Sequence, residues 1–333
     1  MFLSQKSFAD FFYDSRENLQ YVDLNMLTLR NRIVSNDPEL VYENKPNFKY
    51  YDGKEWVNLT NSLGLMDREY PLNKSNNTFR ILALGDSVTE GYLLPSPEAA
   101  YSKQLEKMLN NNLKGYNFEV INAGVGGYNS RQEIRLFEVL APKLKPDLVI
   151  LEYSMGDTAS APKLKKVSED TYRLEYYSTT FPTIMDSEIN AFLVEHSAAY
   201  KFFMKKITNI LKKIGEEELI KYYNIGYKKD KEAFNKLKKI SNQIDAEVVI
   251  FIFPYFEDFN NYTHLEEHDY IKKIAKEAGI DYVDLFDTFK QYEYKELRTN
   301  KYDSMHPNEF GNQIASKAIY DAITKKKLIP NIK

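Results

Sequence analysis

The sequence predicts a protein of the α/β class, in which a parallel sheet lies between layers of helices. Two observations support this prediction. Short, continuous apolar runs, typical of strands buried on both faces, recur along the chain, and amphipathic helical segments alternate with them. Strands and helices that alternate in this way form parallel sheets with right-handed crossovers. The chemistry of such sheets lies beyond the carboxyl ends of the strands.

Five apolar runs are the predicted strands. The first run stops at Gly85, the second at Ala123 and Gly124, and Pro254 stops the fourth. Glycine and proline interrupt regular structure, so these residues mark where the strands end. The runs span residues 80–84, 118–122, 148–153, 247–253 and 282–285.

Helical segments with one apolar face alternate with these runs. In the last of them, apolar residues such as Ile314, Ala318 and Ile319 recur at helical spacing. The predicted helices span residues 97–113, 130–141, 230–244, 265–278 and 308–325.

The chain before the first strand has a different pattern. Residues 1–78 are predicted to form an N-terminal appendage that packs on the main domain, residues 79–333. Residues 9–34 have a helical pattern, and residues 48–59 are typical of a β-hairpin, because Asp-Gly favours a tight turn between the flanking aromatic residues. Residues 158–246 are long for one crossover and are predicted to contain an inserted helical cap near the strand ends.

Composition narrows the possible classes of protein. The 333 residues include 45 Lys and Arg against 48 Asp and Glu, a net charge of −3. The chain therefore lacks the excess of basic residues that is typical of nucleic-acid-binding proteins, so no nucleic-acid partner is predicted. No apolar run is long enough to predict a membrane span, and Asp10 and Asp14 interrupt the start of the chain, so no signal peptide is predicted and a cytoplasmic location is expected. The sequence gives no indication of an oligomeric state.

Residue types limit the chemistry further. There is no cysteine, which excludes disulfides, thiolate metal sites and a cysteine nucleophile. Four histidines remain as candidate bases: His196, His264, His268 and His306. His264 and His268 are four residues apart on a predicted helix, but no third ligand is visible, so no metal site is predicted.

A Gly-Asp-Ser motif follows the first strand. Ser87 is placed at the active edge of the sheet, where a serine nucleophile would need a base and donors for an oxyanion. By itself, Gly85-Asp86-Ser87 is equally typical of a turn with a helix cap.

Two further motifs lie at the same predicted edge. Asp303 and His306 precede the last helix, three residues apart, so that the carboxylate can bond one imidazole nitrogen while the other faces outward. The glycine-rich turn of residues 122–130 follows the second strand and can bring a backbone N–H close to a ligand. Each motif alone also fits a structural loop.

Along the chain, Gly85-Asp86-Ser87 comes first, the glycine-rich turn with Gly127 second, and Asp303 with His306 last. In combination and in this order, the three motifs resemble those of the SGNH/GDSL hydrolase family. Residues 61–71 also look like the segment often found just before the serine in bacterial members. The resemblance covers about residues 60–157 and 247–325. It implies a three-layer α/β/α sandwich with a five-stranded parallel sheet, the flavodoxin-like fold of this family.

The resemblance also implies roles for individual residues. Ser87 would be the nucleophile, His306 the base and Asp303 the residue that orients it. The backbone N–H groups of Ser87 and Gly127 would form the oxyanion hole. No cofactor is implied, because side chains and backbone donors supply the chemistry.

One position departs from the family pattern. Family members usually carry Asn after the third strand as a third oxyanion donor, whereas Gly156 stands at that position here. Losing one such donor typically costs about 2.7–4 kcal/mol in the barrier. Ser154 and Asn129 are candidate substitutes by their proximity in the sequence.

The predicted activity is that of a serine esterase. The expected partner is a small-molecule or glycan ester, such as an O-acetylated carbohydrate, whose small acyl group is transferred to Ser87. Two alternatives remain open. An acyltransferase would use the same three residues and pass the acyl group to a sugar hydroxyl. A non-catalytic binding protein would explain the glycine at position 156.

Overall fold

A computed structural model describes residues 31–51, 56–155, 163–166, 172–175, 228–301 and 303–330. The chain divides into two units, one of residues 28–159 and 229–333 and the other of residues 1–27 and 160–228. In the second unit, β8 (Lys163–Lys166) and β9 (Tyr172–Glu175) form an antiparallel pair. All elements discussed below belong to the first unit. The predicted helix over residues 9–34 and the predicted cap lie largely outside the described residues.

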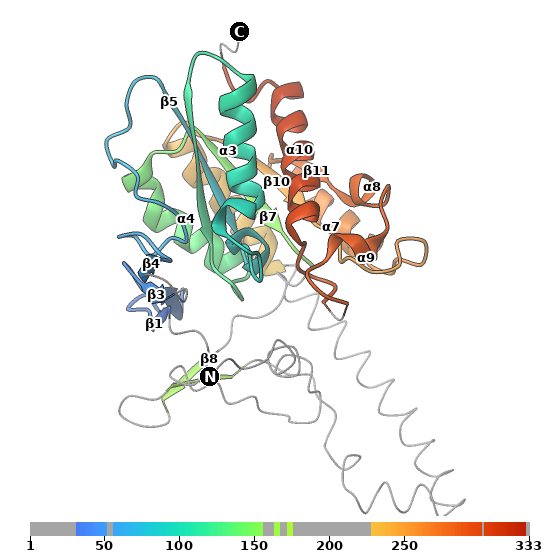
Figure 1. Ribbon diagram of the computed structural model, residues 1–333, viewed down its shortest axis with the longest axis horizontal. Helices are drawn as coiled ribbons and strands as arrows, with labels where there is room; N and C mark the ends of the chain where they lie inside the picture. The colour runs from blue at the N-terminus through green and yellow to red at the C-terminus, as the bar shows by residue number, and fades with distance from the viewer. Residues whose placement is uncertain are drawn as a thin grey trace, which may run out of the picture. The chain divides into compact units, whose positions relative to one another are not determined.

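The first unit is built around a five-stranded parallel sheet with the order β11-β10-β7-β5-β6 (Figure 1). This confirms the predicted fold class, and each strand lies within two residues of its predicted bounds. The strands are β5 (Thr78–Gly85), β6 (Asn117–Gly124), β7 (Leu148–Tyr153), β10 (Glu247–Ile252) and β11 (Asp281–Asp284).

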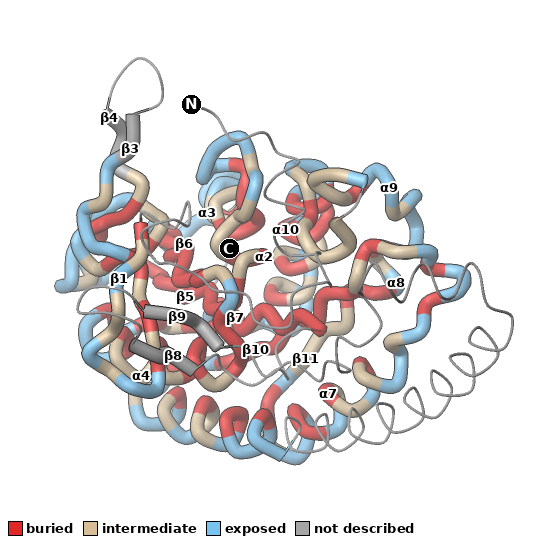
Figure 2. The backbone as a smooth tube through the Cα atoms, turned by 90° about the horizontal axis from the view of Figure 1, so that it is seen from below, coloured by how far each residue is buried: buried red, intermediate tan, exposed pale blue. Residues whose placement is uncertain are grey.

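Helices cover both faces of the sheet, because successive side chains of a buried strand point to opposite faces and both sets are apolar. In β5, Ile81 and Ala83 belong to the core under α3 (Tyr101–Asn112) and α10 (Glu309–Lys325). Leu82 and Leu84, which alternate with them along the strand, are equally buried. Figure 2 shows α3 and α10 on one side of the sheet and α4 (Ser130–Leu144) and α7 (Leu265–Glu277) on the other.

Shorter elements lie at the ends of the strands. Residues 228–243 are also helical, close to the predicted 230–244. The four-residue helices were not predicted, because they are too short to show a helical period. The short elements are α2 (Ser87–Glu90), η1 (Pro97–Ala99), α8 (Phe286–Phe289) and α9 (Tyr294–Leu297).

Two pairs of short antiparallel strands precede the sheet. β3 (Lys49–Tyr51) pairs with β4 (Trp56–Asn58), within the segment that has the hairpin pattern. β1 (Arg32–Val34) pairs with β2 (Tyr42–Asn44). The helix predicted over residues 9–34 is therefore wrong at its end. The β-branched pair Ile33-Val34 suits a strand, and the backbone of β2 supplies the partner that sequence periodicity does not reveal.

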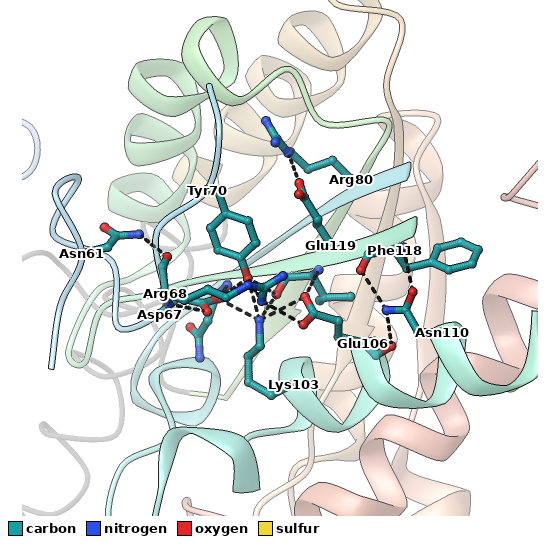
Figure 3. Close-up of polar contacts among 12 residues, drawn as sticks. Asn61, Asp67, Arg68, Tyr70, Arg80, Lys103, Glu106, Asn110, Phe118 and Glu119 are labelled. Carbon is teal, nitrogen blue, oxygen red and sulfur yellow. Dashed lines mark hydrogen bonds and ion pairs between the residues drawn. The ribbon is translucent and has the colours of Figure 1, made fainter. Parts of the chain in front are cut away.

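β6 is an edge strand of the sheet, and side chains bond the backbone groups along its outer edge. Without them, this edge would present unpaired backbone groups to other molecules. They come from α3 and from the segment of residues 61–71, and Figure 3 shows several of them converging on the strand. The pairs are Asn110 with Phe118, Glu106 and Lys103 with Val120, and Asp67 with the N–H of Asn122, at N···O distances of 2.7–3.0 Å.

The strand order reverses at β5, because the chain passes from β5 to β6 on one side and then crosses to β7 on the other. Ligands of doubly wound sheets bind beyond the carboxyl ends of the strands at this reversal. The residues that follow β5, β6 and β7 include Ser87, Gly127 and Ser154. No helix among the described residues is long and apolar enough to cross a membrane.

Candidate active site

Ser87 is the first residue of α2, directly after the end of β5. The side chain of Asp86 caps this helix, because its Oδ1 accepts the N–H of Val88 at 2.8 Å. Gly91 ends the helix in a left-handed conformation, with φ of 89°, and donates its N–H to the carbonyl of Ser87 at 3.1 Å. A cap at each end therefore holds Ser87 in place.

Paired glycines at the ends of β5 and β6 allow α2 to lie against the sheet. Gly85 and Gly124 are register partners. A Cβ on Gly124 would lie 2.2 Å from the backbone nitrogen of Glu90, and one on Gly85 would lie 2.1 Å from Oγ1 of Thr89. Both distances are too short for real contacts. At Gly124 the contacted atoms belong to the backbone of α2, so a side chain there would push α2 and Ser87 away from the strand ends; at Gly85 the contacted atoms belong to the side chains of Thr89 and Glu152.

The loop before α10 brings His306 and Asp303 to Ser87. A hydrogen bond of 2.7 Å joins Ser87 Oγ and His306 Nε2, and one of 2.8 Å joins His306 Nδ1 and Asp303 Oδ2. Asp303 Oδ1 also accepts the backbone N–H groups of Met305 at 2.9 Å and His306 at 3.1 Å. These hydrogen bonds link serine, imidazole and carboxylate in the order of a Ser-His-Asp triad.

The surroundings of Asp303 favour its ionised form. Burial pushes the pKa of this carboxyl upward, but the hydrogen bond and the charge of His306, together with the two backbone N–H groups, outweigh burial and lower the pKa below its usual value. An ionised carboxylate only accepts hydrogen bonds, so Nδ1 of His306 carries a proton. In the neutral imidazole Nε2 is then the acceptor, and Ser87 donates its hydroxyl proton to it.

Tyr92 packs against the imidazole. The ring centroids of Tyr92 and His306 are 4.6 Å apart and the planes are inclined by 52°. Tyr92 follows α2, and its N–H donates to the carbonyl of Ser87 at 2.9 Å. Tyr92 therefore contacts Ser87 through its backbone and His306 through its ring, and this ring lies beside the site.

Two backbone donors are available next to Ser87. Gly127 lies in the turn after β6 with a positive φ of 79°. A Cβ built on its neighbour Gly126 would lie 3.3 Å from the Cβ of Ser87, so this turn contacts the serine. Within the described part of the chain, neither the N–H of Ser87 nor that of Gly127 donates a hydrogen bond. Such donors can stabilise a negatively charged oxygen.

The two candidate substitutes for the missing asparagine have other partners. Ser154 donates its hydroxyl to Asp86 Oδ2 at 3.1 Å. Asn129 caps α4, and its side-chain oxygen accepts the N–H groups of Arg131 and Gln132, both at 3.2 Å. Gly156 lies outside the described residues.

Buried carboxyl groups lie beneath the site. Burial raises the pKa of Asp86 and of Glu133. It also raises the pKa of Asp230 to about 6, although hydrogen bonds from Ser130 and Tyr153 and the charge of Arg131 oppose this effect. Asp86 therefore acts as a structural cap under Ser87, at a position where burial disfavours a negative charge.

Two other histidines, His264 and His268, lie among the described residues. His268 is buried, with Nδ1 2.9 Å from Asp284 and Nε2 3.0 Å from the hydroxyl of Tyr262. His264 bonds Glu267 through Nδ1 at 3.0 Å and lies 3.3 Å from Glu257 through Nε2. No group of three or more His, Asp or Glu residues among those the structure describes could hold a metal ion. His196 lies outside the described residues.

Sequence reasoning missed four residues beside the site: Arg32, Tyr42, Glu90 and Tyr92. Arg32 and Tyr42 contact the Gly126–Gly127 turn, and Glu90 pairs with Arg32. Proximity to Ser87 could have suggested Glu90 and Tyr92. Nothing local in the sequence marks the other two, because three-residue strands place them.

Comparison with known families identifies the family to which the chain belongs. The model of the GDSL-like lipase/acylhydrolase family matches residues 83–314, which is more than half of the chain. The chain therefore belongs to this family, and the predicted resemblance is confirmed. This family comprises GDSL-like lipases and acylhydrolases.

The solved structures that match the chain are distant in sequence. A two-domain esterase active on acetylated mannans is 17% identical with a TM-score of 0.45; the match covers 77% of this chain and 52%, about half, of that one. An acetyl xylan esterase is 17% identical with a TM-score of 0.45, covering 74% of this chain and 100% of that one. The esterase EstA from Pseudoalteromonas sp. is 17% identical with a TM-score of 0.43, covering 75% and 98%. No curated protein sequence matches the chain.

Proposed function

We propose that the protein is a serine esterase that removes a small acyl group, such as the acetyl group of an O-acetylated carbohydrate, through an acyl-enzyme on Ser87. The observation that carries this proposal is the 2.7 Å hydrogen bond between Ser87 Oγ and His306 Nε2, with Asp303 on the far side of the imidazole. A serine hydroxyl is a weak nucleophile until a base accepts its proton.

Acylation begins when Ser87 Oγ attacks the carbonyl carbon of the ester and His306 Nε2 takes the hydroxyl proton. Asp303 holds the imidazole in the required tautomer and stabilises the imidazolium that forms. The tetrahedral intermediate then collapses, the bond to the alcohol breaks, and His306 returns the proton to the leaving oxygen. The acyl group is left as an ester on Ser87.

The N–H groups of Ser87 and Gly127 stabilise the oxyanion of the tetrahedral intermediate. Each donor of this kind typically contributes about 2.7–4 kcal/mol to lowering the barrier. In deacylation a water molecule takes the place of the alcohol. His306 accepts a proton from this water, and the same donors hold the second oxyanion. When the intermediate collapses, the bond between the acyl carbon and Ser87 Oγ breaks, His306 returns the proton to Ser87 Oγ, and the carboxylic acid leaves.

Tyr92 supports a carbohydrate as the alcohol part of the substrate. Its ring packs against His306, which is the base that protonates the leaving alcohol in the proposed reaction. An aromatic ring offers an apolar face with a polar tip, and the apolar face of a sugar ring can pack on it.

The proposal is tested with the variant Ser87→Ala. We expect hydrolysis of p-nitrophenyl acetate to fall by about 10⁴-fold or more, because no other group supplies the nucleophile. Ser96→Ala is the matched control: Ser96 is exposed and makes no capping hydrogen bond, so this variant should keep wild-type activity. Equal turnover by Ser87→Ala and wild type, both folded by circular dichroism, would refute the proposal.

The acyl and alcohol parts of the substrate need a second measurement. Wild type is compared on p-nitrophenyl esters from acetyl to octanoyl and on an O-acetylated oligosaccharide, with acetate release as the readout. We expect kcat/KM to be highest for the acetyl ester and acetate to be released from the sugar. A preference for octanoate would contradict the small acyl group, and a lack of acetate release would contradict the carbohydrate.

A further inference from the structure

The N-terminal strands β1 and β2 reach the turn after β6. Tyr42 on β2 donates its hydroxyl to the carbonyl oxygen of Gly126 at 2.9 Å. The guanidinium of Arg32 on β1 donates through Nη1 to the same oxygen. The Arg32 side chain is only 5% exposed, so these contacts are made away from bulk water.

This carbonyl and the N–H of Gly127 belong to one peptide unit. In a planar trans peptide the C=O and the N–H point in opposite directions. Donors that hold the Gly126 carbonyl on one side therefore hold the Gly127 N–H on the other. Glycine accepts many backbone conformations, so a Gly-Gly peptide has little orientation preference of its own. Contacts from outside the turn must then fix the direction of this N–H.

Arg32 also connects the turn to the helix that carries the serine. Its Nη2 pairs with Glu90 of α2 at 3.2 Å, and Asn44 of β2 donates to the same carboxylate at 3.4 Å. The Arg32 and Glu90 side chains are 5% and 9% exposed, so the pair is screened little by solvent. One guanidinium thus links the two segments that supply the N–H groups of Ser87 and Gly127.

We propose that Arg32 and Tyr42 are positioning residues, which orient the Gly126–Gly127 peptide so that the Gly127 N–H faces the oxyanion. The inference rests on the proposed esterase function and deepens it. Both side chains act through the peptide and not on the substrate, because the Gly126 carbonyl and Glu90 engage them.

The variant Tyr42→Phe tests the proposal, because it removes one donor to Gly126 and keeps the ring. Removing a whole oxyanion donor costs about 10²–10³-fold in kcat, and misdirecting one should cost less, so we expect kcat on p-nitrophenyl acetate to fall by about 10–100-fold. KM should change by less than about 3-fold, since ground-state binding does not use the oxyanion hole. Affinity for a boronic acid that forms a tetrahedral adduct with Ser87 should fall in parallel with kcat.

Tyr128→Phe is the matched control. The Tyr128 hydroxyl donates to the backbone carbonyl of Tyr42, in the same cluster, but makes no bond to the Gly126 carbonyl. If the cluster were merely structural, both variants would lose Tm and kcat together. We expect Tyr128→Phe to lower Tm while kcat and boronate affinity stay near wild type.

Arg32→Lys is a second variant, which retains a charge for Glu90. A single ammonium lacks the fork that reaches both Glu90 and the Gly126 carbonyl, so kcat should again fall while KM stays nearly constant. Wild-type kcat in Tyr42→Phe and Arg32→Lys, with wild type active, would overturn this inference alone. A wild type that neither hydrolyses esters nor reacts with a fluorophosphonate would overturn the proposed function and this inference with it.

Discussion

At the scale of single residues, Asp303 shows how the loop before α10 prepares the imidazole. Oδ1 of its carboxylate accepts hydrogen bonds from two backbone N–H groups. Oδ2 accepts hydrogen bonds from the imidazole of His306 and, at 3.3 Å, from the hydroxyl of Thr299. Hydrogen bonds to the charged form favour it, which is why the pKa of Asp303 stays below its usual value despite burial. The orientation of His306 is therefore fixed before a substrate arrives.

The variant Asp303→Asn should lose both activity and a pH-dependent part of stability. We expect kcat to fall by about 10³–10⁴-fold, because an amide does not hold the imidazole in the required tautomer. The lowered pKa of the folded state means that Asp303 stabilises the fold above its ordinary pKa of about 3.9, and that this contribution is lost as the pH falls through the folded pKa. The Tm difference between wild type and variant should thus be largest at pH 7 and shrink below about pH 4.

Thermal unfolding followed by circular dichroism from pH 3 to pH 8 checks this prediction. Asp321→Asn, on the exposed side of α10, is the control and should match wild type in activity. A Tm difference for Asp303→Asn that stays constant over the whole pH range would contradict the account of this carboxylate.

At the scale of elements, the close approach of α2 to the ends of β5 and β6 places the serine. It depends on Gly124, where a Cβ would meet backbone atoms of Thr89 and Glu90. Backbone atoms move only when the whole helix moves, so this contact cannot relax as a flexible side chain would. A methyl group at position 124 would therefore disturb the site, although it would touch none of the reacting atoms.

The variant Gly124→Ala should be strongly destabilising and should lower kcat. We expect a loss of about 3 kcal/mol in the free energy of unfolding, measured by urea denaturation, because overpacking next to backbone forces a shift of α2. Gly279→Ala is the comparison: a Cβ there meets nothing within 4 Å, and the positive φ of 66° alone should cost about 1 kcal/mol. An equal or larger cost for Gly279→Ala would contradict this role of Gly124.

The same scale shows which elements the sequence could predict. Four of the five strands were predictable because each contains an apolar run ended by a glycine, a proline or a polar residue. The fifth, β11, gives a weaker signal, because only Tyr282 and Val283 of its four residues are apolar. β1 was not, and its residues were interpreted as the end of a helix. A three-residue strand has no period to detect, and β1 exists because β2 pairs with it.

At the scale of the whole molecule, the sheet gathers segments that are far apart in the sequence. The parallel pairing of β5 and β6 places the ends of these strands side by side, and the loop before α10 adds His306. The order of the motifs, and the family resemblance that it carries, were enough to predict that Ser87, Asp303 and His306 lie together. Arg32 and Tyr42 could not be predicted, since their place beside Gly126 depends on tertiary packing of the N-terminal strands.

The proposed reaction requires Ser87 to be an activated nucleophile, and covalent labelling tests this most directly. Wild-type protein is treated with a fluorophosphonate at neutral pH, and its intact mass and peptides are measured. We predict one phosphonyl group per chain, attached to the peptide that contains Ser87, and no adduct on Ser87→Ala. An unmodified wild-type chain, or an adduct on another residue with Ser87 free, would contradict the account.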